Sequence, residues 1–389
     1  MVYDLGFFPM QRYLICIYKS YREKDVGDGE EAGSSNNTLF LLLMLFIAVL
    51  IGTLVAYNLQ HKNSGATPPV AEWVADLIVA QDGSGNFTSI SDAVAALTEN
   101  TSKRFVIKIM PGEYTENIMI DKDKPNVTLI GSGVNITVLK SNRSVKTGWT
   151  TTTSATLDVR GHGFMAQNIS VLNTAGPEGQ QAVAVRIESD LSVFYKVDII
   201  GYQDTLYAKF GRQFYRECNI YGTVDFIFGK ATAVFQNCNL YGRTSPTNHT
   251  ITFTAQGRES RNETNGFSIH NCTIAAIPEI NVTNSKRVAV AYLGRPWKKF
   301  SRTVVMQSFL SDIISPQGWL DWNHSHYSTL NYVEFENRGP GADIRRRVAW
   351  SGFRVLDGAD EARRYTVAEF IDGDQWLPAM NLPYFRGLI

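Results

Sequence analysis

The sequence has no excess of charge, because 37 basic residues balance 37 acidic ones. The balance persists when the first 68 residues are set aside, and the basic residues form no stripe. A nucleic-acid-binding surface normally carries a positive patch. We therefore exclude nucleic acid as a partner.

Several catalytic motifs are also missing. No Gly-X-Ser-X-Gly turn is present, so the usual serine-hydrolase elbow is excluded. The six histidines have no zinc-ligand spacing, and we interpret His324 and His326 as part of a solvated loop. No glycine-rich loop has the remaining residues of a phosphate-binding motif. Zinc chemistry and nucleotide binding therefore have no support.

Long helices between strands are absent as well, which disfavours a doubly wound α/β fold. Short β-branched and aromatic runs, separated by Gly and Asn turns, predict strands instead. These runs are Phe105–Met110, Val127–Ile130, Ala182–Ile187, Ala233–Phe235 and Val288–Tyr292. One early helix is predicted at Ser89–Thr98, capped by Ser89 or Ser91.

An internal repeat accounts for the strands. Similar segments begin at Phe194, Phe214 and Phe235, and their aligned positions recur at spacings of 21 and 20 residues. The aligned columns are Val197, Cys218 and Cys238; Asp198, Asn219 and Asn239; and Gly201, Gly222 and Gly242. Such a period predicts stacked coils, each burying an apolar face on the next. A parallel β-helix fits, whereas the leucine spacing of leucine-rich repeats is absent.

Polar residues of one column should form a ladder, with neighbours about 4.8 Å apart. We expect Asn168, Asn219 and Asn239 to be such ladder residues. Asn168 also begins an Asn-X-Ser motif, which we therefore predict to be unused for glycosylation.

Two aspartates hold the same place in consecutive coils. Asp204 and Asp225 are 21 residues apart and follow the aligned glycines. Their carboxylates should lie roughly 5 Å apart on one face, and one pKa should be raised because both resist ionising together. One aspartate could then donate a proton while the other attacks as an anion. A pair of structural turn aspartates is the alternative.

Three further polar residues could assist. Gln181 lies 22 residues before Gln203, so their amides could stack beside the aspartates and stabilise an oxyanion. Arg295 could hold a carboxylate through two hydrogen bonds. A structural amide ladder and a surface arginine are the alternatives.

One segment is not globular. Residues 39–57 form an uncharged apolar run of 19 residues, whose helix would span roughly 28 Å. Lys19, Arg22 and Lys24 precede it and Lys62 follows, which favours a cytoplasmic N-terminus. A cleaved signal peptide is the alternative. We predict a disordered cytoplasmic tail (1–38), a transmembrane signal anchor (39–57), a stalk (58–70) and a catalytic domain (71–389).

Eleven Asn-X-Ser/Thr motifs follow the anchor and predict a glycosylated body. They begin at Asn86, Asn100, Asn126, Asn135, Asn142, Asn168, Asn248, Asn262, Asn271, Asn281 and Asn323. We therefore expect a protein anchored in membranes of the secretory pathway, with its catalytic domain lumenal or in the cell wall.

Five blocks of the sequence resemble the signature blocks of plant pectin methylesterases, in the family's order and spacing. They are Gly112–Glu116, Gln181–Val185, Gly201–Thr205, Gly222–Gly229 and Leu293–Trp297. The resemblance, which runs from about Ala75 to the C-terminus, implies a right-handed parallel β-helix. It also implies removal of methyl esters from homogalacturonan, giving pectate and methanol, without metal or organic cofactor. A proteinaceous pectin methylesterase inhibitor is an expected partner, and we expect a monomer.

The resemblance also assigns roles to residues. Asp225 would be the nucleophile, and Asp204 would protonate the leaving methanol and then activate water. Gln181 and Gln203 would form the oxyanion hole, while Arg295 would orient Asp225. The sugar-binding cleft would be lined by Tyr207, Phe228, Trp297 and Trp319.

The chain departs from the family pattern in three respects. Val185 stands where leucine is usual, and Thr152 replaces an aromatic residue, which would weaken one sugar subsite. Many members carry an inhibitor-like pro-region before the enzyme, whereas only residues 58–70 separate anchor and enzyme here. No basic dipeptide for processing is present there either. We expect that either no cleavage is needed or the sequence is incomplete.

Two rival functions have less support. A polygalacturonase would need an Asp-Asp pair in one strand with an Arg-X-Lys, and a lyase would need a calcium-binding carboxylate cluster; neither is found. A catalytically inactive, wall-binding β-helix is the rival from another class.

Three cysteines share one column of the repeat. Neighbouring Cα atoms among Cys218, Cys238 and Cys272 should lie about 5 Å apart, within disulfide range. An oxidising lumen favours one bond. The family resemblance favours Cys238–Cys272, with Cys218 reduced, and Cys218–Cys238 is the alternative. Cys16 would lie across the membrane.

Overall fold

The structure, a computed structural model, describes residues 73–245, 249–277, 289–322 and 327–389. These belong to one compact unit, Gly65–Ile389. The predicted tail, anchor and stalk lie outside the described residues. Within the described part of the chain, no helix is both long and apolar enough to cross a bilayer.

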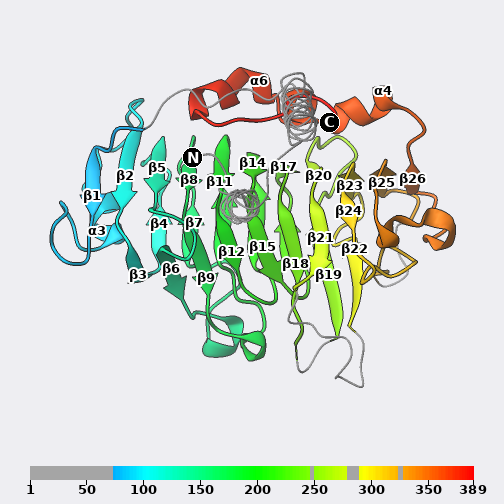
Figure 1. The fold of residues 1–389 in the computed structure, drawn as a ribbon, viewed down its shortest axis with the longest axis horizontal. Coiled ribbons are helices and arrows are strands. Elements are labelled where there is room, and N and C mark those ends of the chain that lie inside the picture. Colours follow the sequence, from blue (N-terminus) through cyan, green and yellow to red (C-terminus); the bar gives the residue numbers. More distant parts are fainter. Residues whose placement is uncertain (1–72, 246–248, 278–288, 323–326) are drawn as a thin grey trace, which may run out of the picture. The chain divides into compact units, whose positions relative to one another are not determined.

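The described strands form three parallel sheets (Figure 1). The eleven-stranded sheet contains, in order, β1 (Leu77–Val79), β2 (Phe105–Ile109), β5 (Val127–Ile130), β8 (Met165–Gln167), β11 (Ser192–Tyr195), β14 (Arg212–Arg216), β17 (Thr232–Gln236), β20 (Gly266–His270), β23 (Arg302–Met306), β25 (Asn331–Phe335) and β26 (Phe353–Val355).

The two other sheets have the same order along the stack of coils. The seven-stranded sheet contains β4 (Ile118–Ile120), β7 (Leu157–Val159), β10 (Val185–Glu188), β13 (Leu206–Phe210), β16 (Ile227–Gly229), β19 (Thr250–Gln256) and β22 (Val290–Gly294). The eight-stranded sheet contains β3 (Gly112–Thr115), β6 (Thr137–Ser141), β9 (Ser170–Asn173), β12 (Asp198–Ile200), β15 (Asn219–Gly222), β18 (Asn239–Gly242), β21 (Thr273–Ala276) and β24 (Phe309–Leu310).

The chain passes through the three sheets in turn, so each strand pairs with its counterpart one coil later. This is a parallel β-helix, and the predicted fold class is confirmed. The predicted strand Val127–Ile130 matches β5 in full, whereas β10 begins at Val185 rather than at Ala182. The predicted helix is α3 (Ile90–Ala95), and the side chain of Ser89 caps it.

Inward-facing aromatic residues stack from coil to coil in the core. Phe194 pairs with Tyr215 and Tyr215 with Phe235, at ring-centroid distances of 5.3 and 4.5 Å. The spacing of 21 residues that aligns Val197 with Cys218 also places Tyr215, rather than Phe214, at the position of Phe194. Phe214 points outward instead and packs in a separate apolar cluster with Leu377.

The polar ladder is confirmed at two of its three expected asparagines. Asn219 donates to Asp198 at 2.7 Å, and Asn239 donates to Asn219 at 2.8 Å. Asn168 is not part of it, because Ser170 pairs with Asp198. Asn168 instead occupies a left-handed turn position, with φ of 55°. Asparagine is favoured there for its tolerance of positive φ.

The C-terminal segment covers the outer face of the eleven-stranded sheet (Figure 1). Its helices are α4 (Ala359–Ala362), η5 (Arg363–Tyr365), α5 (Val367–Phe370), α6 (Gly373–Trp376) and η6 (Leu377–Met380). The other short helices are η1 (Val145–Thr147), η2 (Pro177–Gly179), η3 (Pro340–Ala342) and η4 (Ile344–Arg346). Val367, Trp376 and Leu377 pack against outward side chains of this sheet, so it offers no open cleft there.

The cysteine column is present, but its expected disulfide is wrong. Cys218, Cys238 and Cys272 are all buried and free. Each thiol contacts a backbone carbonyl of the preceding coil, such as that of Phe194, 3.2 Å from Cys218, and that of Phe235, 3.3 Å from Cys272. The sulfurs therefore pack as small apolar groups in the core.

Candidate active site

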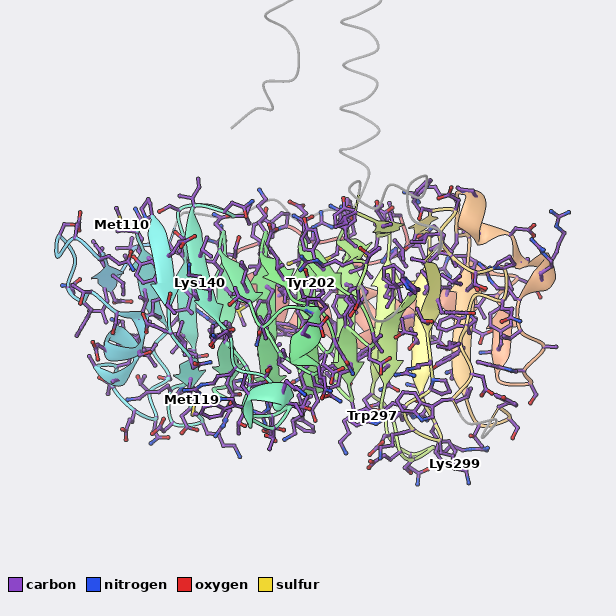
Figure 2. The ribbon with its side chains drawn as sticks, turned by 90° about the horizontal axis from the view of Figure 1, so that it is seen from below. Met110, Met119, Lys140, Tyr202, Trp297 and Lys299 are labelled. Carbon is purple, nitrogen blue, oxygen red and sulfur yellow. The ribbon has the colours of Figure 1, made fainter. Side chains whose placement is uncertain are left out.

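A cleft of about 460 Å³ opens beside the outer face of the seven-stranded sheet. Its lining residues are Thr151, Thr152, Gln181, Gln203, Asp204, Tyr207, Asp225, Phe228, Ala255, Arg295, Trp297 and Trp322. Figure 2 shows Met119 of β4 and Trp297 along the same edge of this unit. The cleft gathers most of the polar residues that the sequence singled out.

Asp204 and Asp225 lie side by side on neighbouring coils. Leu206 pairs with Ile227, and the backbone N–H of Asp204 donates to the carbonyl of Val224 at 3.1 Å, so the aspartates share one column. Both have left-handed backbones, with φ of 61° and 52°. The predicted shared face is therefore observed.

The two neighbours of this column differ in polarity. Backbone bonds from Ala182 and Ala184 set the fully buried Val183 opposite Asp204. On the other side, the pairing of Ile227 with Thr254 sets Thr252 opposite Asp225. One carboxyl therefore faces a hydrocarbon side chain and the other a hydroxyl.

Asp225 is held by a bidentate ion pair. Arg295 donates from Nε to Oδ1 and from Nη2 to Oδ2 of Asp225, both at 2.7 Å. The hydroxyl of Thr252 donates to Oδ1 at 2.8 Å and accepts the backbone N–H of Asp225 at 2.7 Å. Bonds of this kind between charged groups are strong and specific in geometry. They hold the Asp225 carboxylate in one orientation in the cleft.

Asp204 has the opposite surroundings. Burial raises the pKa of Asp204 well above its ordinary value, the negative charge of Asp225 raises it further, and Arg295 lowers it in part. No described side chain donates a hydrogen bond to its carboxyl group. Asp204 is therefore suited to hold a proton that it can transfer.

Gln181 and Gln203 line the cleft beside the aspartates. Their coils are joined by a bond from the N–H of Ala182 to the carbonyl of Gln203, at 3.2 Å. Both side chains are half-buried. Their amide groups can donate hydrogen bonds to an oxygen that develops charge in the cleft.

Three aromatic side chains form one wall of the cleft. The rings of Tyr207 and Phe228 stack at 4.3 Å, and Phe228 meets Trp297 edge-on at 6.1 Å. Trp297 lies against Gly257, where an added Cβ would come within 2.7 Å of the indole ring. Glycine at position 257 therefore leaves the room that the Trp297 ring occupies.

The prediction for Trp319 was wrong. Trp319 forms a bridge with Gly294, is only 1% exposed and stacks on Tyr332 at 4.3 Å. The cleft contains Trp322 instead, whose ring lies 4.0 Å from the Arg295 guanidinium. Both tryptophans occur in one short segment outside the repeat, so no periodic signal distinguishes them.

Two other features complete the cleft. Thr151 and Thr152 lie at its edge, where Thr152 was predicted to replace an aromatic residue. Thr252 has no sequence signal, because it follows Asp225 by 27 residues rather than by one repeat. Among the described residues, no group of three or more His, Cys, Asp or Glu side chains could hold a metal ion.

Several known proteins are similar to this chain in sequence and in fold. The family model described as Pectinesterase matches residues 76–374. The chain is 51% identical over 342 residues to pectinesterase/pectinesterase inhibitor PPE8B of Prunus persica, covering 83% of this chain and 65% of that protein. It is 47% identical over 315 residues to pectinesterase 2 of Citrus sinensis, covering 81% and 61%.

Solved structures agree with the sequence comparisons. Pectin methylesterase from carrot superposes with a TM-score of 0.80 at 42% identity, covering 82% of this chain and all of that one. The chain spans about three fifths of the length of the curated relatives it matches. From the family model and these identities, the chain belongs to the pectinesterase family.

Proposed function

We propose that this protein is a pectin methylesterase that hydrolyses methyl esters of homogalacturonan to pectate and methanol. The main support is the contrast between adjacent carboxyls, one held by Arg295 and one buried with a raised pKa. Pectinesterase relatives that are 51% and 47% identical to this chain support the same substrate. The residues present supply an acid, a base and a nucleophile without a metal or organic cofactor.

In the first step, the Asp225 carboxylate attacks the ester carbonyl carbon. The carbonyl electron pair moves to oxygen, where the amides of Gln181 and Gln203 donate hydrogen bonds. The intermediate then expels the methoxy group as Asp204 transfers its proton to it, which releases methanol. The products of this step are an acyl-enzyme anhydride on Asp225 and an ionised Asp204.

In the second step, Asp204 acts as a base. It takes a proton from a water molecule, whose oxygen attacks the anhydride carbon. The bond to Asp225 breaks, which restores the Asp225 anion and releases the galacturonic acid carboxyl group, whose remaining proton passes to solvent as pectate forms. Asp204 is protonated again, and its raised pKa favours that resting state.

The aromatic wall of the cleft would bind the sugar rings. Tyr207, Phe228 and Trp297 present ring faces and edges to the cleft, and Trp322 faces it over Arg295. Aromatic surfaces suit the apolar faces of sugars, while the neutral ester avoids repulsion from Asp225.

Methanol release from methylated homogalacturonan tests the function. Asp225→Asn and Asp204→Asn should each reduce turnover by orders of magnitude, because each removes a distinct step. Arg295→Lys should lower kcat roughly tenfold to hundredfold, since an ammonium cannot reproduce the two-point contact. Near-normal turnover in Asp225→Asn would defeat the assigned mechanism. A wild type that binds pectin without releasing methanol would instead support an inactive wall-binding protein.

The proposal also covers the location of the protein. We propose a single anchor at 39–57, a glycosylated domain in the secretory pathway or cell wall, a monomeric state, and inhibition by a proteinaceous pectin methylesterase inhibitor. Glycosidase treatment of plant-expressed protein should lower its mass, and carbonate extraction should leave it in the membrane fraction. An unglycosylated cytosolic product would refute this topology.

A further inference from the structure

Asp225 has two carboxylate oxygens that differ in their hydrogen bonds. Oδ1 accepts from Arg295 Nε at 2.7 Å and from the Thr252 hydroxyl at 2.8 Å, whereas Oδ2 accepts, among the described residues, only from Arg295 Nη2 at 2.7 Å. A carboxylate oxygen offers about two lone-pair sites for such bonds. Both sites of Oδ1 are therefore occupied, and one site of Oδ2 stays open to the cleft.

The same hydroxyl also holds the backbone. Thr252 accepts the N–H of Asp225 at 2.7 Å, and its own N–H donates to the carbonyl of Thr223 at 3.0 Å. Asp225 has a left-handed φ of 52°, a conformation that persists only where neighbouring contacts fix it. Thr252 thus restrains the backbone and the side chain of Asp225 together.

Thr252 is fully buried, and it does not line the cleft. It therefore cannot act by binding substrate. A hydroxyl in this place can affect the reaction only through the carboxylate that it contacts.

We propose that Thr252 is a positioning residue that orients the Asp225 carboxylate and leaves Oδ2 as the attacking oxygen. The inference rests on the proposed esterase function. In the attack, the open lone pair of Oδ2 forms the bond to the ester carbon, and the carbonyl electron pair moves to oxygen. Arg295 Nε and Thr252 keep Oδ1 in place, so the carboxylate plane does not rotate away from the ester.

Thr252→Val tests this role, because valine matches threonine in shape but has no hydroxyl. We expect kcat for methanol release to fall roughly tenfold to hundredfold, the range for a hydrogen bond to a charged group. KM should change by less than about twofold, because Thr252 does not touch the substrate. Thr252→Ser should restore kcat to within about threefold of the wild type.

Thr137→Val provides the matched control. Thr137 is also fully buried on a strand, accepts a backbone N–H from Ser132 at 3.0 Å and donates to backbone carbonyls. It lies on β6, far along the stack from the coil of Asp225. Thr137→Val should lower the melting temperature about as much as Thr252→Val while leaving kcat unchanged.

Several results would overturn the inference. A kcat for Thr252→Val within about threefold of the wild type, a change in KM alone, or no rescue by serine would each do so. If Thr252→Val does not fold, Thr252→Cys replaces it, since a thiol is a weaker donor and should give a kcat well below that of Thr252→Ser. Equal kcat for the cysteine and serine variants would then refute it. Absence of methanol release by the wild type would refute the esterase function itself, which separates the two failures.

Discussion

Asparagine substitutions of the two aspartates should shift stability in opposite directions. Asp204→Asn removes a carboxyl group whose ionised form burial and Asp225 both disfavour, whereas Asp225→Asn removes the carboxylate that pairs with Arg295. Both aspartates have left-handed backbones, with φ of 61° and 52°. Asparagine tolerates that conformation as well as aspartate does, so the backbone adds no difference.

The expected magnitudes follow from the contacts. Two carboxylates roughly 5 Å apart repel by about 3 kcal/mol at an effective dielectric constant of about 20. Arg295 offsets part of this, so we expect Asp204→Asn to raise the free energy of unfolding by roughly 1–2 kcal/mol near neutral pH. Asp225→Asn leaves a guanidinium that is 25% exposed without its partner. The cost should be roughly 1–3 kcal/mol, below the 3–5 kcal/mol of a fully buried pair.

The sign of the pH dependence identifies the cause. Because folding raises the pKa of Asp204, the unfolded chain loses this proton first as pH rises. The wild type therefore loses stability from about pH 4 upward, until the folded pKa is passed. Asp204→Asn has no carboxyl group to ionise at this position, so its free energy of unfolding does not fall in this way. The difference in stability between the variant and the wild type should therefore shrink toward zero as pH falls to about 4.

Calorimetric melting at several pH values measures these effects. A change of 1 kcal/mol should move the melting temperature by roughly 1–2 °C in a domain of this size. The reasoning would be refuted if Asp204→Asn were destabilised at neutral pH, or if its gain did not depend on pH. The methanol-release assay provides a second check, because both variants should be nearly inactive although their stabilities shift in opposite directions.

Two further predictions concern a tryptophan pair and a buried histidine. Trp322→Ala should raise KM roughly twofold to tenfold with little effect on melting, because its ring faces the cleft over Arg295. Trp319→Ala should instead lower the free energy of unfolding by roughly 3–5 kcal/mol in denaturant titrations, since its ring is buried; reversed effects would contradict this assignment. His270 is buried, and burial lowers its pKa to about 4, so stability should fall as pH drops from about 6.5 to about 4. His270→Gln should remove this fall in stability between about pH 6.5 and 4, and an unchanged dependence of stability on pH would refute the interpretation.

The repeat explains why the sequence alone predicted the fold and the central pair. Strands of successive coils have nearly constant spacing, so residues about 21 positions apart must become neighbours. The period is therefore sufficient to place Asp204 beside Asp225. It also predicts the Asn219–Asn239 ladder, since equal positions in parallel strands face the same side.

The register could not be predicted wherever a turn changes length. Within the regular coils the spacing stays at 20 or 21 residues, and Tyr215 stacks between Phe194 and Phe235 as that spacing requires. The longer connection before β19 departs from that spacing. It places Thr252 27 residues after Asp225, at a distance that no repeat of about 20 would indicate.

Segments outside the repeat depended on tertiary packing alone. The sequence gives no signal that distinguishes Trp319 from Trp322. In the structure, Trp319 forms a bridge with Gly294 and its ring is buried in the core, whereas the ring of Trp322 lines the cleft. The cysteine column was predicted by the period, but only the structure shows that all three thiols are free and contact backbone carbonyls of the preceding coil. Periodicity fixes which residues are neighbours along the stack, whereas the direction of each side chain depends on the close packing around it.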